Sequence, residues 1–191
     1  MKILYFDLET TGTMFWKNGI HQLAGCIEID GIVVEKFDYN VQPYHKAQIN
    51  DEALSIAGIT REHLKTYEPM NLVYRKFVDM LGKYVDKFNK KDKFTLCGYN
   101  NASFDNPFLR AWFVQNGDNY FGSWFWSSSI DVMVMAHCHL MAQRPEMVDF
   151  KLKTVASKMG LQVDESKLHD GFYDIELTRG IYNLIRQSTT Y

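Results

Sequence analysis

Residues 3–12 read Ile-Leu-Tyr-Phe-Asp-Leu-Glu-Thr-Thr-Gly, and this stretch decides the fold. The apolar residues favour a β-strand and Gly12 favours a turn, so we expect the strand to end here. Because alternate side chains of a strand share a face, Asp7 and Glu9 should project side by side and Leu8 into the core. Such a carboxylate pair suits a hard cation such as Mg²⁺. An isolated Asp-x-Glu pair, however, is more often two solvated acids at a strand end.

The composition is that of an ordinary globular protein. The chain has 191 residues, of which 46% are hydrophobic and 23% charged. These values predict one domain over residues 1–191 and exclude a disordered or fibrous protein. No apolar run approaches the ~18 residues that cross a bilayer, and no secretory signal pattern opens the chain, so we expect no membrane partner.

The net charge limits the kinds of partner that this chain can bind, and its cysteines indicate the cellular compartment. The formal net charge is −2, which excludes coating of nucleic acid by bulk positive charge, so any such contact should be local. Cys26, Cys97 and Cys138 are odd in number and far apart in the sequence. This pattern favours free thiols in a reducing cytoplasm.

Turn signals and periodicity predict an α/β fold. Asp30-Gly31 between apolar runs predicts an antiparallel hairpin of residues 21–29 and 32–41. A 3.6-residue apolar period predicts an amphipathic helix over 71–88, whose terminal lysines indicate a solvated end or, alternatively, phosphate contacts. The further elements expected are a short helix at 50–57, a strand at 94–99, a helix at 105–116, an aromatic loop at 118–130, a strand end and helix at 130–141, and helices at 152–159 and 171–187. Their order predicts a mixed sheet flanked by helices.

A second candidate segment is Asn101-Ala102-Ser103-Phe104-Asp105, which follows the predicted strand and opens a helix. An Asp at a helix N-terminus is explained by N-capping, since it accepts free backbone N–H groups and faces the positive end of the dipole. A capping carboxylate keeps a second oxygen, so Asp105 is also a candidate metal ligand.

A third candidate segment is His169-Asp170-Gly171-Phe172-Tyr173-Asp174. If Asp170 caps the last helix, His169 and Asp174 occupy the N′ and N4 positions, which touch in a hydrophobic staple. The pair is then either a surface ion pair of little worth or a histidine beside a metal-ligating carboxylate. An imidazole has a pKa suited to general-base chemistry.

Together these segments resemble the DnaQ-like DEDD exonucleases, in the variant that carries a histidine. The family's D-x-E-T-T-G motif is matched by residues 7–12, its N-A-x-F-D motif by residues 101–105, and its H-x-x-x-x-D motif by residues 169–174. A family G-I-T segment is matched by residues 58–60. The chain departs from relatives at Ala57 and Asn100, where His is frequent, which bears on substrate contacts and on no metal ligand.

The resemblance implies a ribonuclease H-like mixed sheet and two-metal hydrolysis of phosphodiester bonds from a 3′ end, releasing 5′ mononucleotides. The two divalent cations would be Mg²⁺ or Mn²⁺. Asp7 would bridge both ions, and Glu9 and Asp174 would hold the ion that carries the nucleophilic water. Asp105 would help to hold the other ion, and His169 would accept the proton of the water.

The substrate contacts are less defined. The resemblance implies contacts to the terminal nucleotide from the backbone N–H groups of Glu9 and Thr10 and from the hydroxyl of Thr10 or Thr11, and Asn101 of the second motif is a further candidate. Phe104 is expected in the core or in the wall of a cleft. Phe15 and Trp16 either stack on a base or belong to the core. The aromatic residues of 120–126 are expected in the core, with a substrate wall or a partner surface as the alternatives.

The expected partner is the 3′ end of a nucleic acid, with single-stranded DNA as the first choice and RNA as the alternative. A polymerase or a second copy of the chain is not decided by the sequence. The rival function is an inactive nucleic-acid-binding or scaffolding domain with the same fold. Retention of all five chemical residues, Asp7, Glu9, Asp105, His169 and Asp174, counts against that rival.

Overall fold

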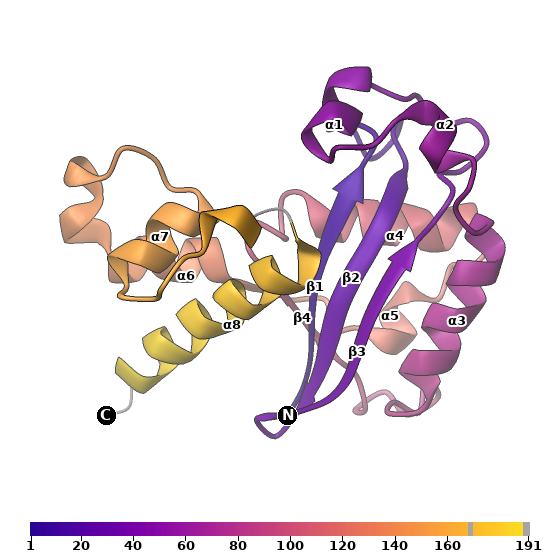
Figure 1. Cartoon of the computed structure of the whole chain (residues 1–191). Coiled ribbons are helices and arrows are strands. Elements are labelled where there is room, and N and C mark those ends of the chain that lie inside the picture. The colour runs from indigo at the N-terminus through magenta and orange to yellow at the C-terminus, as the bar shows by residue number, and fades with distance from the viewer. Residues whose placement is uncertain (168–169, 189–191) are drawn as a thin grey trace.

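A computed structural model describes residues 1–167 and 170–188 of the chain. The described part contains a five-stranded sheet in the order β3-β2-β1-β4-β5 (Figure 1). The strands are β1 (Lys2–Thr10), β2 (Ile20–Ile29), β3 (Ile32–Asn40), β4 (Thr95–Gly98) and β5 (Ile130–Asp131). Strand β2 is antiparallel to both β1 and β3, whereas β4 is parallel to β1 and β5 is parallel to β4. This mixed sheet confirms the predicted fold class.

The hairpin between β2 and β3 forms where the sequence predicts it. Asp30 and Gly31 have φ angles of 51° and 88°. Positive φ at both central residues matches the right-handed twist of the two strands that a two-residue turn joins. The turn sets the register in which Ile29 pairs with Ile32.

Helices cover both faces of the sheet, with α3, α4 and α5 on one side and α6, α7 and α8 on the other (Figure 1). The helices are α1 (Asp51–Ile56), α2 (Arg61–Leu64), α3 (Met70–Gly82), α4 (Asp105–Gln115), α5 (Phe121–Trp124), α6 (Val132–His139), α7 (Leu152–Lys158) and α8 (Gly171–Ser188), with short 3₁₀ turns η1 (Met141–Glu146) and η2 (Glu165–Lys167). Each face of the sheet packs against its own hydrophobic core, and alternate residues of β1 point into one or the other. Phe6 belongs to the same core as Phe77 of α3, and Tyr5 belongs to the same core as Ile181 of α8. No described helix has the length and apolarity that a bilayer span requires.

The helix predicted over 71–88 is wrong in its last third, because α3 ends at Gly82. Glycine is a poor helix former, and the carbonyl of Tyr84 accepts a hydrogen bond from Lys2 Nζ. Val85 is buried, but Phe88 is 85% exposed, so the apolar period beyond Gly82 does not mark a buried helical face. The lysines of this region therefore lie in a loop after the helix.

The aromatic loop is core only in part. A short helix, α5, forms within it, and Phe121, Trp124 and Phe125 are buried. Tyr120 and Trp126 are exposed, so the expectation of a core role does not hold for these two side chains. Trp126 recurs below as part of a groove on the surface.

Candidate active site

Asp7 and Glu9 lie near the carboxyl end of β1, both half-buried, with the buried Leu8 between them. The alternation in burial confirms that the two carboxylates share a face of the sheet and that Leu8 enters the core. Burial raises the pKa of Asp7 to about 7, and the negative charges of Glu9 and Asp174 add to this effect. Asp7 therefore lies in a pocket of negative charge contributed by two distant parts of the chain.

Asp105 is the first residue of α4 and is buried against β1. Its Oδ1 accepts a hydrogen bond of 3.2 Å from the backbone N–H of Leu8. Burial raises the pKa of Asp105 well above its ordinary value, and the charge of Asp7 raises it further. The N–H groups of Asp105 and Leu8 oppose this shift by donating to the carboxylate.

The N-cap explanation of Asp105 is wrong in its geometry. Phe104 holds the N-cap position and no side chain caps this helix. Asp105 instead turns toward β1, because the N-terminus of α4 lies beside the strand that carries Asp7. The carboxylate of Asp105 therefore belongs to the cluster of acids and also joins α4 to β1.

Asp174 enters the cluster from the first turn of α8. Asp170 caps this helix as predicted, because its Oδ1 accepts from the N–H groups of Phe172 and Tyr173 at 3.0 and 3.1 Å. The charge of Asp174 contributes to the raised pKa of Asp7. The prediction of His169 as general base falls outside the described residues.

A glycine brings α8 close to the sheet. A Cβ atom added at Gly171 would lie only 2.8 Å from the Cβ of Ala24 in β2. Ala24 is the residue that pairs with Asp7 across the β1–β2 ladder. The close contact of Gly171 with Ala24 therefore sets the approach of the first turn of α8 to Asp7 (Figure 1).

The donor chemistry of the cluster, which comprises Asp7, Glu9, Asp105 and Asp174, fits a divalent cation. Buried carboxylates that raise one another's pKa are relieved by protons or by a positive ion, and carboxylate oxygens are the ligands of hard cations. Within residues 1–167 and 170–188, no three His, Cys, Asp or Glu side chains are already arranged to hold a metal ion.

Asp131, which the sequence analysis missed, holds the second motif in place. It ends β5, caps α6 and accepts hydrogen bonds from the N–H groups of Asn100 and Ala102, both at 3.1 Å. Asn100 has a φ of 62°, a conformation that Asn tolerates better than most residues. An Asp directly before the apolar run Val132–Ala136 is a helix-start signal that could have identified this cap, though not its contacts with the motif.

The hydroxyl groups of Thr10 and Thr11 form hydrogen bonds within the fold, and their role as substrate contacts stays a prediction. Both residues are buried. The Thr10 hydroxyl donates to the carbonyl of Gly12 at 2.7 Å, and the Thr11 hydroxyl donates to the carbonyl of Gln48 at 2.8 Å. The tight turn after β1 needs these bonds to satisfy its buried polar groups.

The other residues predicted to contact the substrate differ in their exposure to solvent. Asn101 is buried and its Nδ2 donates to Asn106 Oδ1 at 3.3 Å, whereas its Oδ1 has no hydrogen-bond partner among the described residues, so its role as a substrate contact stays a prediction. Phe104 is half-buried against the core, as expected of a cleft wall. Phe15 and Trp16 are 38% and 62% exposed, so the core alternative is wrong for both and a stacking role remains open.

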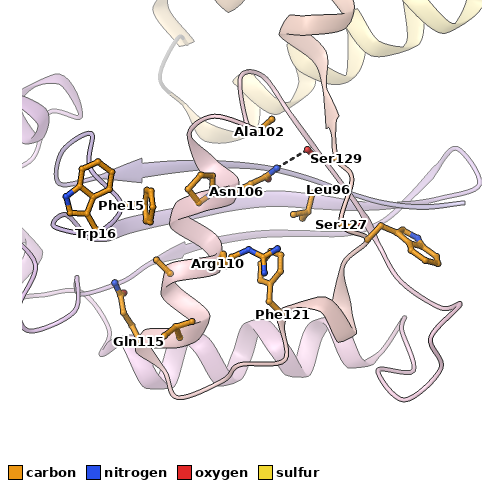
Figure 2. A pocket seen from close by; sticks show the side chains of 14 residues that line it. Phe15, Trp16, Leu96, Ala102, Asn106, Arg110, Gln115, Phe121, Ser127 and Ser129 are labelled. Carbon is orange, nitrogen blue, oxygen red and sulfur yellow. Dashed lines mark hydrogen bonds between the residues drawn. The ribbon is translucent and has the colours of Figure 1, made fainter.

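A groove of about 710 Å³ follows the exposed side of α4, and Asn106, which directly follows Asp105 in the helix, is among its lining residues. Figure 2 shows Phe15 and Trp16 on one side of α4, Ser127 and Ser129 on the other, and Asn106 and Arg110 on the helix between them. The Asn106 side chain donates to the Ser129 hydroxyl at 2.9 Å and so joins the helix to the far wall. We call this feature the α4 groove.

Comparisons with known proteins agree with this geometry. The exonuclease family model RNase_T matches residues 4–182. DNA polymerase III PolC-type of Mycoplasmopsis pulmonis is 27% identical over 180 residues, which cover 94% of this chain and 11% of that protein. The PolC-type polymerase of Streptococcus pyogenes serotype M2 is 32% identical over 106 residues, 56% of this chain and 6% of the relative. The chain thus matches a small part of much longer relatives.

Solved structures share the fold. Escherichia coli exonuclease I in complex with a dT13 oligonucleotide aligns with a TM-score of 0.76 and 22% identity over 97% of this chain and 41% of that one. A zinc-bound complex of the same enzyme with single-stranded DNA aligns with a TM-score of 0.75 and 22% identity over 98% of this chain and 41% of that one. The family model over residues 4–182 confirms the DnaQ-like resemblance, and the chain belongs to the RNase_T family of exonucleases.

Proposed function

We propose that this chain is a divalent-metal-dependent 3′–5′ exonuclease that hydrolyses the terminal phosphodiester bond of a nucleic acid and releases 5′ mononucleotides. The observation that carries the proposal is the carboxylate cluster, in which burial and mutual repulsion raise the pKa of Asp7 to about 7 and that of Asp105 well above its ordinary value. Clustered buried acids cost stability. A protein retains such a cost at a site where a positively charged metal ion binds.

The resemblance to the DEDD exonucleases suggests a role for each acid. Asp7 would be the ligand that two divalent ions share, and Glu9 and Asp174 would help to hold the ion that activates the attacking water. Asp105, whose Oδ1 accepts from the Leu8 N–H, would help to hold the ion nearer the leaving 3′ oxygen. Divalent ions bound here would supply a nucleophilic water near neutral pH and neutralise charge on the phosphate.

The proton of the attacking water goes to His169 in this proposal. An imidazole has an ordinary pKa near neutrality and accepts a proton without a large driving force. Its place in the sequence, five residues before Asp174 and directly before the Asp170 cap, supports this role. If Asp7 and Glu9 bind metal ions, their carboxylates are not available to accept the proton of the water. A separate base such as His169 can then take this proton.

Single-stranded DNA is the first-choice substrate and RNA the alternative. Exonuclease I, which shares the fold, has been crystallised with a dT13 oligonucleotide. The PolC-type relatives are DNA polymerases, which supports a polymerase as a candidate partner. The placement in the cytoplasm remains a prediction from the free thiols, of which Cys26 and Cys97 are buried and Cys138 is exposed.

The test is digestion of matched 5′-labelled single-stranded DNA, duplex DNA and RNA with Mg²⁺, with Mn²⁺ and with a chelator. We expect products that shorten by one nucleotide at a time from the 3′ end, release of 5′ mononucleotides, and no product with the chelator. Asp7→Ala should abolish the reaction at saturating Mg²⁺. Full activity in that variant, or binding of the strand without cleavage by the parent, would contradict the proposal.

A further inference from the structure

The loop between α3 and β4 presents a large apolar side chain to solvent. Phe88 is 85% exposed, although aromatic side chains of this size are mostly buried in proteins. It lines a cavity of about 480 Å³ together with residues 82–87 and Trp124. Because Trp124 is a buried member of the hydrophobic core, the cavity opens onto apolar surface. Phe88 and this cavity together offer a place where an apolar group of another molecule is shielded from water.

Hydrogen bonds within the loop hold Phe88 in its exposed position. The backbone N–H of Phe88 donates to Asp86 Oδ1, and the N–H of Asp86 donates to Asp92 Oδ2, both at 3.0 Å. Asp92 also forms an ion pair with Lys2 of β1, which ties the loop to the sheet. A surface that is ordered before its partner arrives loses little conformational entropy on binding. The loop is therefore preorganised to display Phe88.

Positive charge surrounds Phe88. Segment 83–93 contains five lysines and two aspartates, whereas the whole chain has a net charge of −2. Asp92 is already paired with Lys2. Lys87, Lys90 and Lys91 are exposed, and none of them forms an ion pair with a described residue. This local excess of unpaired lysines is complementary to an acidic partner.

The aromatic rings at this surface already carry an ammonium group. Lys87 Nζ lies 5.4 Å from the ring centroid of Phe88 and 5.7 Å from that of Trp124, over both rings. A nucleic-acid base would have to displace this ammonium in order to stack on either ring. A carboxylate, in contrast, pairs with the ammonium where it lies, while an aliphatic side chain fits the cavity beside it. The arrangement therefore favours a protein segment over a nucleic acid.

This surface lies at the end of the sheet away from the carboxylate cluster. Its loop is tied to Lys2 at the start of β1, and Glu9 follows seven positions later in the same strand. Seven residues of a strand span about 23 Å. In Figure 1 the end of α3 lies near the N-terminus, whereas α1 lies at the opposite end of the sheet. A partner bound at the loop therefore leaves the cluster open.

We propose that Lys87, Phe88, Lys90 and Lys91 form a docking surface for an acidic segment of a partner protein. Carboxylates of the segment pair with the three ammonium groups, and one aliphatic side chain of the segment enters the cavity lined by Phe88 and Trp124. The inference goes beyond the proposed nuclease function and does not depend on it. It assigns the lysines after α3 to a protein partner and not to phosphate contacts.

The test is fluorescence anisotropy with a fluorescein-labelled peptide, Asp-Glu-Asp-Leu-Glu-Asp-Glu, in a low-salt buffer that contains a chelator. We expect saturable binding to the parent that weakens as salt is added, because exposed charge pairs are screened. Phe88→Ser and Lys87→Gln should each weaken the Kd about 10-fold, as expected when one central contact of an interface is removed. Val148→Ser and Lys151→Gln, at exposed positions elsewhere, are the matched controls and should keep the parental Kd. Absence of saturable binding, or the same Kd in the parent and both loop variants, would overturn the proposal.

Changes in the probe identify the occupant. A peptide with Ser in place of Leu should bind about 10-fold more weakly, and a peptide with Asn and Gln in place of the acids should not bind. A 12-nucleotide oligo-dT and phosphatidylserine vesicles are measured on the same loop variants. If Phe88→Ser and Lys87→Gln weaken binding of either probe more than they weaken binding of the peptide, the surface serves a nucleic acid or a lipid and the proposal is wrong.

A further variant separates this proposal from the proposed nuclease function. Asp7→Ala removes a carboxylate of the cluster and should bind the peptide with the parental Kd, whether or not the parent cleaves nucleic acid. A weaker Kd in Asp7→Ala would mean that the peptide reaches the cluster, contrary to the proposal. Thermal melting checks that Phe88→Ser and Lys87→Gln are folded, as expected for exposed side chains.

Discussion

The backbone N–H of Leu8 donates a 3.2 Å hydrogen bond to Oδ1 of Asp105 and so joins β1, the strand of Asp7 and Glu9, to the helix of the second motif. The two residues are 97 positions apart in the sequence. This bond fixes the Asp105 carboxylate against β1. It also keeps a buried negative charge next to Asp7, whose own pKa is raised by burial and by Glu9 and Asp174.

Asp105→Asn should lower nuclease activity and raise the stability of the metal-free protein. The amide oxygen still accepts from Leu8, but the buried charge is gone, so we expect the metal-free protein to melt ~2–4 °C higher, or ~1 kcal/mol for a chain of this size. Nuclease activity should fall by ~10²-fold or more, as expected when a preorganised electrostatic contact is removed. Thermal melting in chelator and digestion of oligo-dT measure the two effects. The exposed Asp79→Asn in α3 is the control, and a lower melting temperature in Asp105→Asn would contradict the repulsion that we infer.

Gly171→Ala should displace the first turn of α8. The new methyl group would lie 2.8 Å from the Cβ of Ala24, so the helix must shift and carry Asp174 away from Asp7. We expect turnover to fall ~10-fold or more, since a displacement of ~1 Å at a catalytic group costs up to ~10²-fold. Initial rates on oligo-dT at saturating Mg²⁺ provide the measurement.

The double variant Ala24→Gly/Gly171→Ala moves the methyl group from the strand to the helix and should recover most of the turnover. Gly122→Ala is the matched control, because a Cβ atom there meets nothing within 4 Å. Equal loss in the single and the double variant would show that the contact with Ala24 does not position α8.

His169→Ala tests the proposed general base. We expect turnover to fall by ~10²-fold or more while the carboxylates still bind metal, because the loss of a general base affects the chemical step. Initial rates give the first effect, and the rise of the melting temperature with added Mn²⁺ reports binding. His45→Ala, at an exposed position, is the control. Parental turnover in His169→Ala would remove this residue from the mechanism.

The parts of the fold that the sequence predicts well are local. The hairpin at Asp30-Gly31 and the cap of α8 by Asp170 each depend on a few adjacent residues, and each forms as expected. Strand alternation was likewise enough to place Asp7 and Glu9 on one face. Such features follow from backbone geometry and short-range hydrogen bonds, which the sequence displays directly.

The parts that the sequence did not predict depend on distant neighbours. Nothing near Asp105 indicates that its carboxylate turns to Leu8 and not to its own helix. The burial of Thr11 and Asn101 follows from how the turn after β1 and the loop after β4 pack, and the end of α3 follows from a contact with Lys2. These are tertiary effects that override local preference.

His21 gives a test of stability against pH that is independent of the carboxylate cluster. It is 2% exposed, and neither ring nitrogen has a hydrogen-bond partner among the described residues. Burial lowers the pKa of His21 to about 4 from an ordinary 6.5, so the folded state keeps the ring neutral. Between these two pH values the unfolded chain binds a proton that the folded chain does not, and the free energy of unfolding therefore falls as the pH decreases. The loss from this residue should reach ~3 kcal/mol near pH 4 and grow no further below it.

His21→Leu should remove this loss. We expect the variant to match or exceed the parent at pH 7, because two unpartnered buried nitrogens are gone, and to lose less stability down to pH 4. Urea unfolding at several pH values measures the difference between variant and parent, in which the contributions of the carboxylates cancel. His45→Leu at an exposed position is the control and should follow the parent. Parallel curves for His21→Leu and the parent would mean that the ring is solvated or protonated in the fold.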